Sequence, residues 1–539
     1  MSTIAELVRA AEPSEPKPLG DLLDRLAAEG RLRGARVGGK AIGPAALAGI
    51  PVRGVTHDSR AVVRDGLFVA IPGAHVDGHD FADAAVRAGA SVVLVERPVD
   101  ADVAQVVVAA TQSALATAAA WWYGDPAREL GVIGITGTDG KTTTSFLAVA
   151  ALEAAGLAPG LVSTVATRIG AHHEDNAEHA TTPDAPALQA TLRAMTAAGN
   201  RTAVLETTSH GLALERVGGI AYDAAILTNV THEHLEFHGT WERYRAAKLS
   251  LFERLAGPAK TTAGMTWPKV AIVNHDDPSA GLFVGTAQEA GARVLTYGTD
   301  PAADVRATGV EEDGAGVRFD YEGPTGRGRL QLRLGGRFNV HNALAVLALG
   351  EAWELDADAA RDGLQVLRRV PGRMERIDAG QPFDVIVDYA HSPASLAAVL
   401  DLLAPSAAAK GGGLIAVFGS AGERDLEKRP QMGRIAGERC RLVVLTDEDP
   451  RGEDRERILD EIAQGAERVG RRRGHDLLLI ADRRAAIEAA FEAARPNDVV
   501  LLAGKGHEQS IIGPDGPLPW DESSVAREVL AAMGHATPA

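Results

Sequence analysis

The sequence predicts an α/β protein of three domains, with a parallel sheet flanked by helices at its centre. The first observation is length, because 539 residues exceed what one hydrophobic core organises. The second is a rhythm of short apolar runs separated by helical spacers, which is typical of parallel sheets. The third is a glycine-rich turn at 137–140, placed between a β-branched run and an Ala/Leu-rich helical segment.

We expect the domains to span 1–122, 123–368 and 369–539. Residues 1–45 are weakly specified apart from a short helix near 19–30. The central domain should contain strands within 160–164, 202–209, 224–230, 270–277 and 293–298, followed by a β-rich passage at 304–334. The third domain should again be doubly wound, or Rossmann-like, with strands that begin the segments 384–393, 412–425, 441–454, 476–482 and 498–509.

Composition excludes several classes of function. The net charge of −17 without a basic domain argues against nucleic-acid binding, and no apolar stretch reaches membrane-spanning length. The single cysteine, Cys440, rules out a disulfide framework and suits a reducing compartment. The first residues lack the apolar core and basic flank of a secretory signal. We therefore expect a cytoplasmic monomer that acts on small molecules.

The glycine-rich turn is the strongest chemical signal. Glycines there allow backbone N–H groups to curl around an anion, and the helix beginning at Lys141 adds its positive N-terminal end. Lys141 would neutralise terminal phosphates, while the Thr142 hydroxyl would reach Mg²⁺. The strict phosphate-loop pattern is imperfect because Ile135 occupies its first glycine position, so an ordinary strand-to-helix turn is the alternative. The candidate nucleotide-binding residues are Gly137, Thr138, Gly140, Lys141, Thr142 and Thr143.

A second group of candidates is Glu206, His234 and Lys248. Glu206 ends a predicted strand, where its carboxylate would face the phosphate-loop helix and suit Mg²⁺. His234 and His238 stand four residues apart, but Leu235 replaces the glutamate that a zinc-protease helix requires. Another transition metal remains the alternative for these histidines. Separately, a turn at 58–60 (Asp-Ser-Arg) could bind a phosphorylated or hydroxylated group, or be only a turn.

Seven strings occur in order along the chain: GTDGKTTT, ETTSHGLALERV, TNVTHEHLEFHGTWERYRAAKLSLF, FNVHNALA, VPGRME, DYAHSP and AGKGHE. Together they resemble the Mur ligase family over about Val52 to Glu522. The resemblance implies a central ATP-binding domain, an N-terminal domain that binds a UDP-sugar, and a C-terminal domain that binds an amino acid. It also implies a reaction: the carboxylate of a UDP-linked muramoyl dipeptide is activated by ATP and Mg²⁺ as an acyl phosphate. A dibasic amino acid is then added, as a step of peptidoglycan precursor synthesis.

The resemblance assigns roles to individual residues. Lys141, His234 and Lys248 would be catalytic, with Lys248 where the family carries a carbamylated lysine. The metal ligands would be Thr142, Glu206, His234 and Lys248. Further nucleotide contacts would be Asn339 and Asn342 near the adenine, and Arg373, Asp388 and His391 from the third domain. The UDP-muramoyl dipeptide would contact Ser59, Thr181, Thr182, Ser209 and Arg216.

The amino-acid site departs from the family pattern at one position. The family's Asp-Asn-Pro-Arg selector is Glu448-Asp449-Pro450-Arg451 here, so aspartate replaces asparagine. We expect Asp449 to disfavour the second carboxylate of diaminopimelate and to favour lysine or ornithine slightly. The candidate amino-acid contacts are Arg424, Glu448, Asp449, Arg451, Gly504 and Glu508.

Two alternative functions are weighed against this one. A folylpolyglutamate synthetase shares the phosphate loop but lacks both the Asp-Ser-Arg first domain and the AGKGHE string. A non-catalytic Mur-like nucleotide-binding protein would be expected to lose Glu206, His234 or Lys248, and all three are retained.

Overall fold

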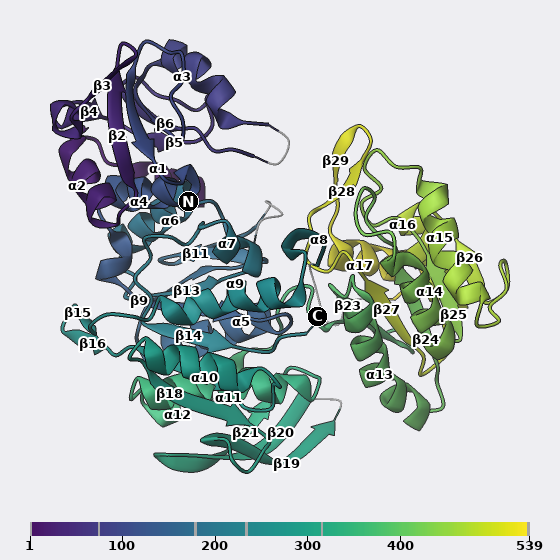
Figure 1. Cartoon of the computed structure of the whole chain (residues 1–539). Coiled ribbons are helices and arrows are strands. Elements are labelled where there is room, and N and C mark those ends of the chain that lie inside the picture. Colours follow the sequence, from purple (N-terminus) through teal and green to yellow (C-terminus); the bar gives the residue numbers. More distant parts are fainter. Residues whose placement is uncertain (1–2, 74–75, 177–180, 232–234, 314–315, 536–539) are drawn as a thin grey trace. The chain divides into compact units, whose positions relative to one another are not determined.

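The computed structural model describes residues 3–73, 76–176, 181–231, 235–313 and 316–535. The chain folds into two compact units (Figure 1). The first comprises Met1–Val310, Arg318–Leu330 and Val340–Val366, and the second comprises Glu311–Val317, Gln331–Asn339 and Leu367–Ala539. Within the described ranges, none of the helices has the length and apolar character needed to cross a bilayer.

The first unit begins with a six-stranded sheet of order β3-β2-β8-β7-β6-β5, in which β5 to β8 are parallel. Its strands are β2 (Leu32–Val37), β3 (Lys40–Ile42), β5 (Val55–Thr56), β6 (Gly66–Val69), β7 (Ala90–Val95) and β8 (Ala104–Val108). The associated helices are α2 (Gly20–Ala28), α3 (Ala82–Ala88) and α4 (Thr111–Tyr123). Leucines of α2 and tryptophans of α4 share one core with these strands.

Residues 1–45 are more ordered than the sequence predicted. The helix near 19–30 is confirmed as α2, but β2 and β3 also form, because β2 pairs antiparallel with β8 on one side and with the edge strand β3 on the other. A further helix, α1 (Ile4–Ala10), starts with a capping box between Thr3 and Glu6. Its apolar side chains pack against the core of the central sheet. The local sequence pattern does not predict this tertiary contact.

The central sheet has eleven strands in the order β12-β11-β10-β13-β9-β14-β17-β18-β19-β20-β21. The seven strands that lie between β10 and β19 in this order, both included, are parallel, which confirms the predicted parallel sheet. They are β9 (Gly131–Thr136), β10 (Pro159–Val162), β13 (Thr202–Glu206), β14 (Ala224–Leu227), β17 (Val270–Asn274), β18 (Arg293–Gly298) and β19 (Val305–Asp313). The remaining strands are β11 (Ala166–Ile169), β12 (His172–Asp175), β20 (Gly316–Gly323) and β21 (Gly326–Leu332).

Helices cover this sheet, as Figure 1 shows. Helices α6 (Ala185–Ala197), α9 (Trp241–Glu253) and α10 (Ala280–Glu289) share a core with alternate residues of the strands. Helix α5 (Lys141–Ala154) packs with α12 (Ala357–Val366). The others are α7 (Ser209–Ala213), α8 (Leu235–His238) and α11 (Phe338–Ala352), and a hairpin joins β15 (Lys260–Thr262) to β16 (Met265–Trp267).

The second unit contains a six-stranded sheet of order β22-β23-β27-β24-β25-β26, parallel except for β22. The strands are β22 (Glu375–Ile377), β23 (Asp384–Asp388), β24 (Leu414–Phe418), β25 (Leu442–Leu445), β26 (Leu477–Leu479) and β27 (Val499–Ala503). Helices α13 (Pro393–Ala409), α14 (Lys428–Arg439) and α15 (Arg455–Glu467) pack in one core, and α16 (Arg483–Ala493) and α17 (Glu522–Ala532) in another. The predicted doubly wound fold is therefore confirmed. A hairpin of β28 (Ser510–Gly513) and β29 (Gly516–Pro519) follows β27.

Candidate active site

The phosphate loop connects β9 to α5, and its backbone requires glycine at two places. Gly137 has φ 153° and Gly140, the N-cap residue of α5, has φ 83°. A Cβ on Gly137 would lie 1.8 Å from the Thr228 hydroxyl oxygen, and one on Gly140 would lie 2.5 Å from Oδ1 of Asn342. The turn is thus both left-handed and tightly enclosed, as a backbone cradle for an anion requires.

Lys141 starts α5 and curls over the loop. Its Nζ donates to the carbonyl oxygens of Gly137 at 3.0 Å and Thr138 at 2.8 Å. The Thr138 hydroxyl lies 2.9 Å from the Tyr244 hydroxyl of α9 and so ties the loop to a second helix. The ammonium group therefore lies on the phosphate loop, beside the N-terminus of α5, where a phosphate would be bound.

Glu206 lies at the carboxyl end of β13, next to β9 in the sheet. The register pairs Glu206 with Ile135, so its carboxylate reaches the first turn of α5. It accepts hydrogen bonds from the hydroxyls of Thr142 at 3.3 Å and Thr164 at 2.8 Å, and it is only 1% exposed. The expected proximity of Glu206 to the phosphate-loop helix is confirmed. Thr143 is also buried on this first turn.

Lys248 lies on α9 and is 1% exposed, so it is not a lysine of the helix surface. Its Nζ donates to the carbonyl oxygen of Gly137 at 2.7 Å and sits 4.4 Å from the centre of the Tyr244 ring. Lys141 and Lys248 therefore share one acceptor at the phosphate loop. A residue 111 positions away in sequence is thus brought to the loop by the packing of α9.

His234, the remaining member of this group, lies outside the described residues. His238 is described: its Nε2 lies 3.1 Å from the Ser209 hydroxyl. In the part of the chain that the structure describes, no three histidine, cysteine or carboxylate side chains gather into a metal site. Oxygen atoms of Glu206 and Thr142 are therefore the donors available here, a set that suits a hard cation such as Mg²⁺.

The dipeptide candidates of the central domain form a chain of hydrogen bonds next to Glu206. The Thr164 hydroxyl oxygen lies 3.0 Å from the Thr181 hydroxyl oxygen, and the Thr182 hydroxyl donates to the Glu206 carbonyl at 2.9 Å. Arg216 donates to the Thr182 carbonyl at 2.8 Å. Ser209 begins α7 and has His238 as its partner, a pairing that the sequence analysis missed because it weighed His238 only as a metal ligand.

Ser59 lies apart from that chain of hydrogen bonds. It occupies the turn after β5, beside Arg60, whose guanidinium pairs with Asp58 at 2.8 Å. The side-chain and backbone hydrogen bonds from Arg60 lower the pKa of Asp58 to about 2. The Asp-Ser-Arg motif is thus a self-bonded turn that leaves Ser59 partly accessible.

Asn339 and Asn342 lie on the first turns of α11. Asn342 is buried and its Oδ1 accepts a hydrogen bond from the Thr144 hydroxyl of α5 at 3.2 Å. Asn339 is also buried, and its Nδ2 donates to the Gly335 carbonyl at 2.7 Å. Asn342 is therefore brought to the phosphate loop, whereas Asn339 closes the turn that precedes its own helix.

In the second unit, the nucleotide candidates gather around Tyr389. The Arg373 guanidinium carbon lies 4.8 Å from the Tyr389 ring centre, and the His391 ring lies 4.5 Å from it. Asp388 accepts the backbone N–H groups of Met374 and Ala390 and so shapes the loop. Burial, with a smaller contribution from the Glu508 carboxylate, raises the pKa of Tyr389, so it stays a neutral phenol. Sequence reasoning did not single out this tyrosine.

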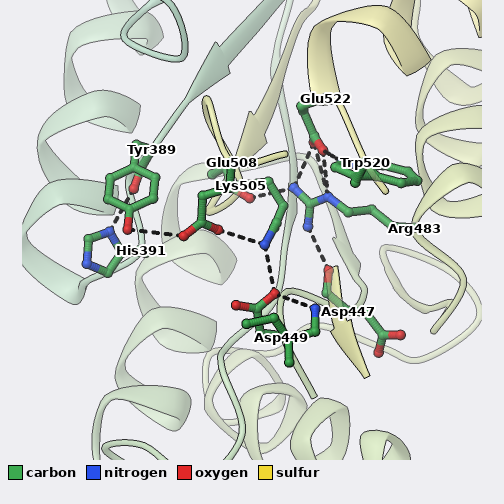
Figure 2. Close-up of polar contacts among 11 residues, drawn as sticks. Tyr389, His391, Asp447, Asp449, Arg483, Lys505, Glu508, Trp520 and Glu522 are labelled. Carbon is green, nitrogen blue, oxygen red and sulfur yellow. Dashed lines mark hydrogen bonds and ion pairs between the residues drawn. The ribbon is translucent and has the colours of Figure 1, made fainter. Parts of the chain in front are cut away.

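The amino-acid candidates lie on loops that follow β24, β25 and β27, at the carboxyl edge of the sheet. Oδ1 of Asp449 accepts hydrogen bonds from Lys505 Nζ at 2.8 Å and from the Ile512 backbone N–H at 2.9 Å. Lys505, which is fully buried, also pairs with Glu508 at 2.6 Å (Figure 2). The Asp449 carboxylate is therefore partnered by the Lys505 ammonium, and the expected effect of Asp449 on the choice of amino acid stays a prediction.

Glu448 and Arg451, on the loop after β25, each carry a buried polar atom that lacks a hydrogen bond to any described residue. Among the described residues, neither Oε2 of Glu448 nor Nε of Arg451 has a hydrogen-bond partner, although both atoms are buried. Arg451 has a left-handed backbone, with φ 55°, which turns the loop. A Cβ on Gly504 would lie 3.3 Å from Oε2 of Glu448, so the glycine leaves room beside this carboxylate. Arg424 is exposed on the loop after β24.

The fold and the loop together define a nucleotide-binding protein of the phosphate-loop α/β class. The chain belongs to the Mur ligase family. Family models match residues 51–122 (Mur ligase family, catalytic domain), 135–350 (Mur ligase middle domain) and 372–506 (Mur ligase, glutamate ligase domain).

Individual relatives extend this similarity over most of the chain. A UDP-N-acetylmuramyl-tripeptide synthetase of Roseiflexus sp. (strain RS-1) is 48% identical, over 90% of this chain and 95% of the relative. A UDP-N-acetylmuramoyl-L-alanyl-D-glutamate–2,6-diaminopimelate ligase of Bacillus licheniformis is 40% identical, over 89% and 95%. A solved structure of a ligase with the latter name is 32% identical, with a TM-score of 0.62 over 91% of this chain and 97% of that one.

Proposed function

We propose that this protein is an ATP-dependent ligase that adds a diamino acid to UDP-N-acetylmuramoyl-L-alanyl-D-glutamate in peptidoglycan precursor synthesis. The observation that carries the proposal is the convergence of Lys141, Lys248 and Glu206 on one phosphate loop. Relatives that are 40–48% identical over most of their length bear names of this activity.

The residues at the loop fit ATP and Mg²⁺. Backbone N–H groups of Gly137–Gly140 and the N-terminus of α5 suit the phosphates, and the buried Glu206 carboxylate with the Thr142 hydroxyl suits the cation. His234 and a carbamylated Lys248 would complete the ligand set. Bound there, Mg²⁺ would supply positive charge to the transferred phosphoryl group.

The protein's own groups then account for the two steps. Lys141 stabilises charge as the γ-phosphoryl group passes to the dipeptide carboxylate, which becomes an acyl phosphate. Thr181, Thr182, Ser209 and Arg216 would hold that carboxylate beside Glu206. The amine of the diamino acid attacks the acyl carbon, an amide forms and phosphate leaves. Positioning supplies much of the acceleration, since both reactants are held in one orientation.

One assay tests the whole proposal. Phosphate release from ATP should require both the muramoyl dipeptide and a diamino acid, and the product should be the corresponding tripeptide. A folylpolyglutamate synthetase would instead respond to a folate and glutamate, and a non-catalytic binding protein would release no phosphate with any of these substrates. Either result would overturn the proposal. Retention of buried Glu206 and Lys248 at the loop supports a catalytic protein.

We propose that the protein acts as a monomer in the cytoplasm, on small molecules and without nucleic acid. The net charge of −17 supports the last point, and the buried free thiol of Cys440 suits a reducing compartment. Sedimentation of the purified protein at several concentrations tests the monomer.

The identity of the diamino acid depends on the loops after β25 and β27. The unpartnered carboxylate oxygen of Glu448 suits an ammonium group, which diaminopimelate, lysine and ornithine all carry. The unpartnered Nε of Arg451 suits a distal carboxylate, which only diaminopimelate carries. Lys505 pairs with Asp449 but also with Glu508, so the preference for lysine or ornithine is weaker than the charge of Asp449 alone would give, and parallel assays with the three amino acids decide among them.

Asp449→Asn should raise kcat/KM for diaminopimelate relative to lysine by about tenfold, the effect expected of one nearby charge. One ammonium, that of Lys505, is shared between the carboxylates of Asp449 and Glu508, so the substitution removes the excess negative charge of this group and a second carboxylate is repelled less. Steady-state kinetics with both amino acids measure the ratio. Asp447→Asn is the matched control, because the Asp447 side chain pairs with Arg455 instead of Lys505. An unchanged ratio in Asp449→Asn means that this charge does not act on the distal end of the substrate.

A further inference from the structure

Arg483 is a charged side chain that the proposed reaction does not use, yet it is fully buried. It is the first residue of α16, directly after the N-cap residue Asp482. Burying a guanidinium without partners is strongly unfavourable. The partners of Arg483 therefore indicate which parts of the fold this side chain holds together.

The guanidinium of Arg483 has three sets of partners. Nε donates to both carboxylate oxygens of Glu522, at 3.1 and 2.8 Å, and Nη2 donates to the same carboxylate at 2.7 Å. Nη1 donates to the carbonyl oxygen of Asp447 at 2.8 Å. Nη2 also donates to the carbonyl oxygen of Ala503 at 2.8 Å (Figure 2). Glu522, the first residue of α17, is likewise fully buried, so this is a completely desolvated ion pair.

The two carbonyls belong to the loops that carry the amino-acid candidates. Asp447 follows β25 and precedes the loop 448–451, whereas Ala503 ends β27 and precedes the loop 504–508. The strands β25 and β27 do not touch, because β24 lies between them in the sheet. Arg483 thus spans the carboxyl end of β24 and links the bases of two loops that the sheet itself does not join.

Trp520 extends this link to the far end of the second loop. Its indole N–H donates to Glu522 at 2.6 Å, and its backbone N–H donates to the carbonyl oxygen of Gln509 at 2.9 Å. Within the same loops, Lys505 joins Asp449 to Glu508 (Figure 2). The loops are therefore linked by Arg483 at the residues that precede them and by Lys505 within the loops themselves.

We propose that Arg483, held by Glu522, is a positioning residue for the amino-acid site, because it sets the separation of the loops at 448–451 and 504–508. The inference rests on the proposed function, which assigns the amino acid to these loops. The planar guanidinium donates hydrogen bonds to two carbonyl oxygens and a carboxylate at once. A lysine ammonium reproduces this geometry only in part. Loss of this link lets the two loops separate, and a shift of one ångström in positioning groups is enough to weaken binding.

The test compares Arg483→Met and Arg483→Lys with the unaltered enzyme. In Arg483→Met we expect KM for the diamino acid to rise by about tenfold or more, with KM for ATP and for the muramoyl dipeptide changed less than about twofold. Arg483→Lys should recover part of the loss. Hydrogen exchange by mass spectrometry should show faster exchange in 447–451 and 504–508 of Arg483→Met.

Arg441→Met is the matched control. Arg441 pairs with Asp498 through Nε at 3.0 Å and donates to the Ala493 carbonyl, so its chemistry resembles that of Arg483. It lies at the opposite ends of the same strands, immediately before β25, with Asp498 immediately before β27. Arg441→Met should lower the melting temperature without a selective rise in KM for the diamino acid.

The outcomes separate the two proposals. If the unaltered enzyme makes no tripeptide, the proposed function fails. If it does, and a folded Arg483→Met raises all three KM values equally or none of them, the positioning role fails. If Arg483→Met does not fold, Glu522→Gln and Trp520→Phe test the positioning role instead. Each of these variants removes part of the link and keeps Arg483. A selective rise in KM for the diamino acid in both supports the role, and unchanged values overturn it.

Discussion

Lys141→Ala should lower ligase turnover by about 100-fold or more, the range measured when one charge-stabilising donor is removed from an active site. Lys141 lies over the phosphate loop, where its ammonium would neutralise the γ-phosphoryl group during transfer. The side chain is only half-buried, so its loss removes charge without opening a cavity. Steady-state phosphate release measures turnover, and circular dichroism with a thermal melt checks that the fold persists.

Lys17→Ala is a suitable control for Lys141→Ala. Lys17 belongs to the same unit and donates to the Trp121 carbonyl at 2.9 Å, away from the phosphate loop. Turnover of this variant should stay within about twofold of the unaltered enzyme, as for most substitutions outside a site. Near-normal turnover in Lys141→Ala itself would show that the ATP site has been assigned wrongly.

Lys248→Ala should be nearly inactive, with a loss of about 100-fold or more, and formate or acetate should restore part of its activity. A neutral lysine amine can combine with CO₂ to give a carbamate, which binds a cation as a carboxylate does. The structure favours this test, because Nζ of Lys248 is buried 2.7 Å from the Gly137 carbonyl, directly beside the phosphate loop. A carbamate nitrogen keeps one N–H group, so that hydrogen bond can persist. A small carboxylate in the vacated space would replace the lost anion.

Lys260→Ala distinguishes chemical rescue from general stabilisation by carboxylates. Lys260 is a second buried lysine of the same unit and pairs with Asp223 at 2.6 Å, far from any phosphate-loop residue in sequence. Burial lowers the pKa of Lys260 to about 8 despite that pair. Formate should not restore any activity lost in Lys260→Ala. If Lys248→Ala retains most of its turnover, or if Lys248→Arg is fully active, the lysine acts without a carbamate.

The elements that the sequence predicted correctly depend on residues close together in the chain. The run at 131–136, the glycines at 137 and 140, and the helix from Lys141 form one strand–turn–helix unit, and each part agrees with its neighbours. The parallel sheets were also predicted, because buried parallel strands are short apolar runs with helical spacers. Glu206 was placed correctly for the same reason: a residue that ends a strand lies at the edge where the sheet binds ligands.

The features that the sequence did not predict depend on contacts between residues that are distant in the chain. Strand β2 has only one buried residue, Ala35, so its pattern resembles a loop until β8 and β3 lie beside it. Lys248 reads as an exposed helix residue until α9 packs on the loop at Gly137. Local patterns carry no information about such contacts, because burial is a property of the folded chain.

By itself, the sequence determined the fold class, the phosphate loop and the family whose chemistry uses that loop. These three follow from local periodicity and from the order of the motifs. The tertiary structure alone decided the electrostatics of the amino-acid site. The sequence shows the charge of Asp449 but not its partner Lys505, which lies 56 residues away and also pairs with Glu508. Arg483 and Glu522 lie 39 residues apart and were not recognised as a pair. A charged side chain takes its role from the nearest opposite charge in space, and only folding brings that partner within 3 Å.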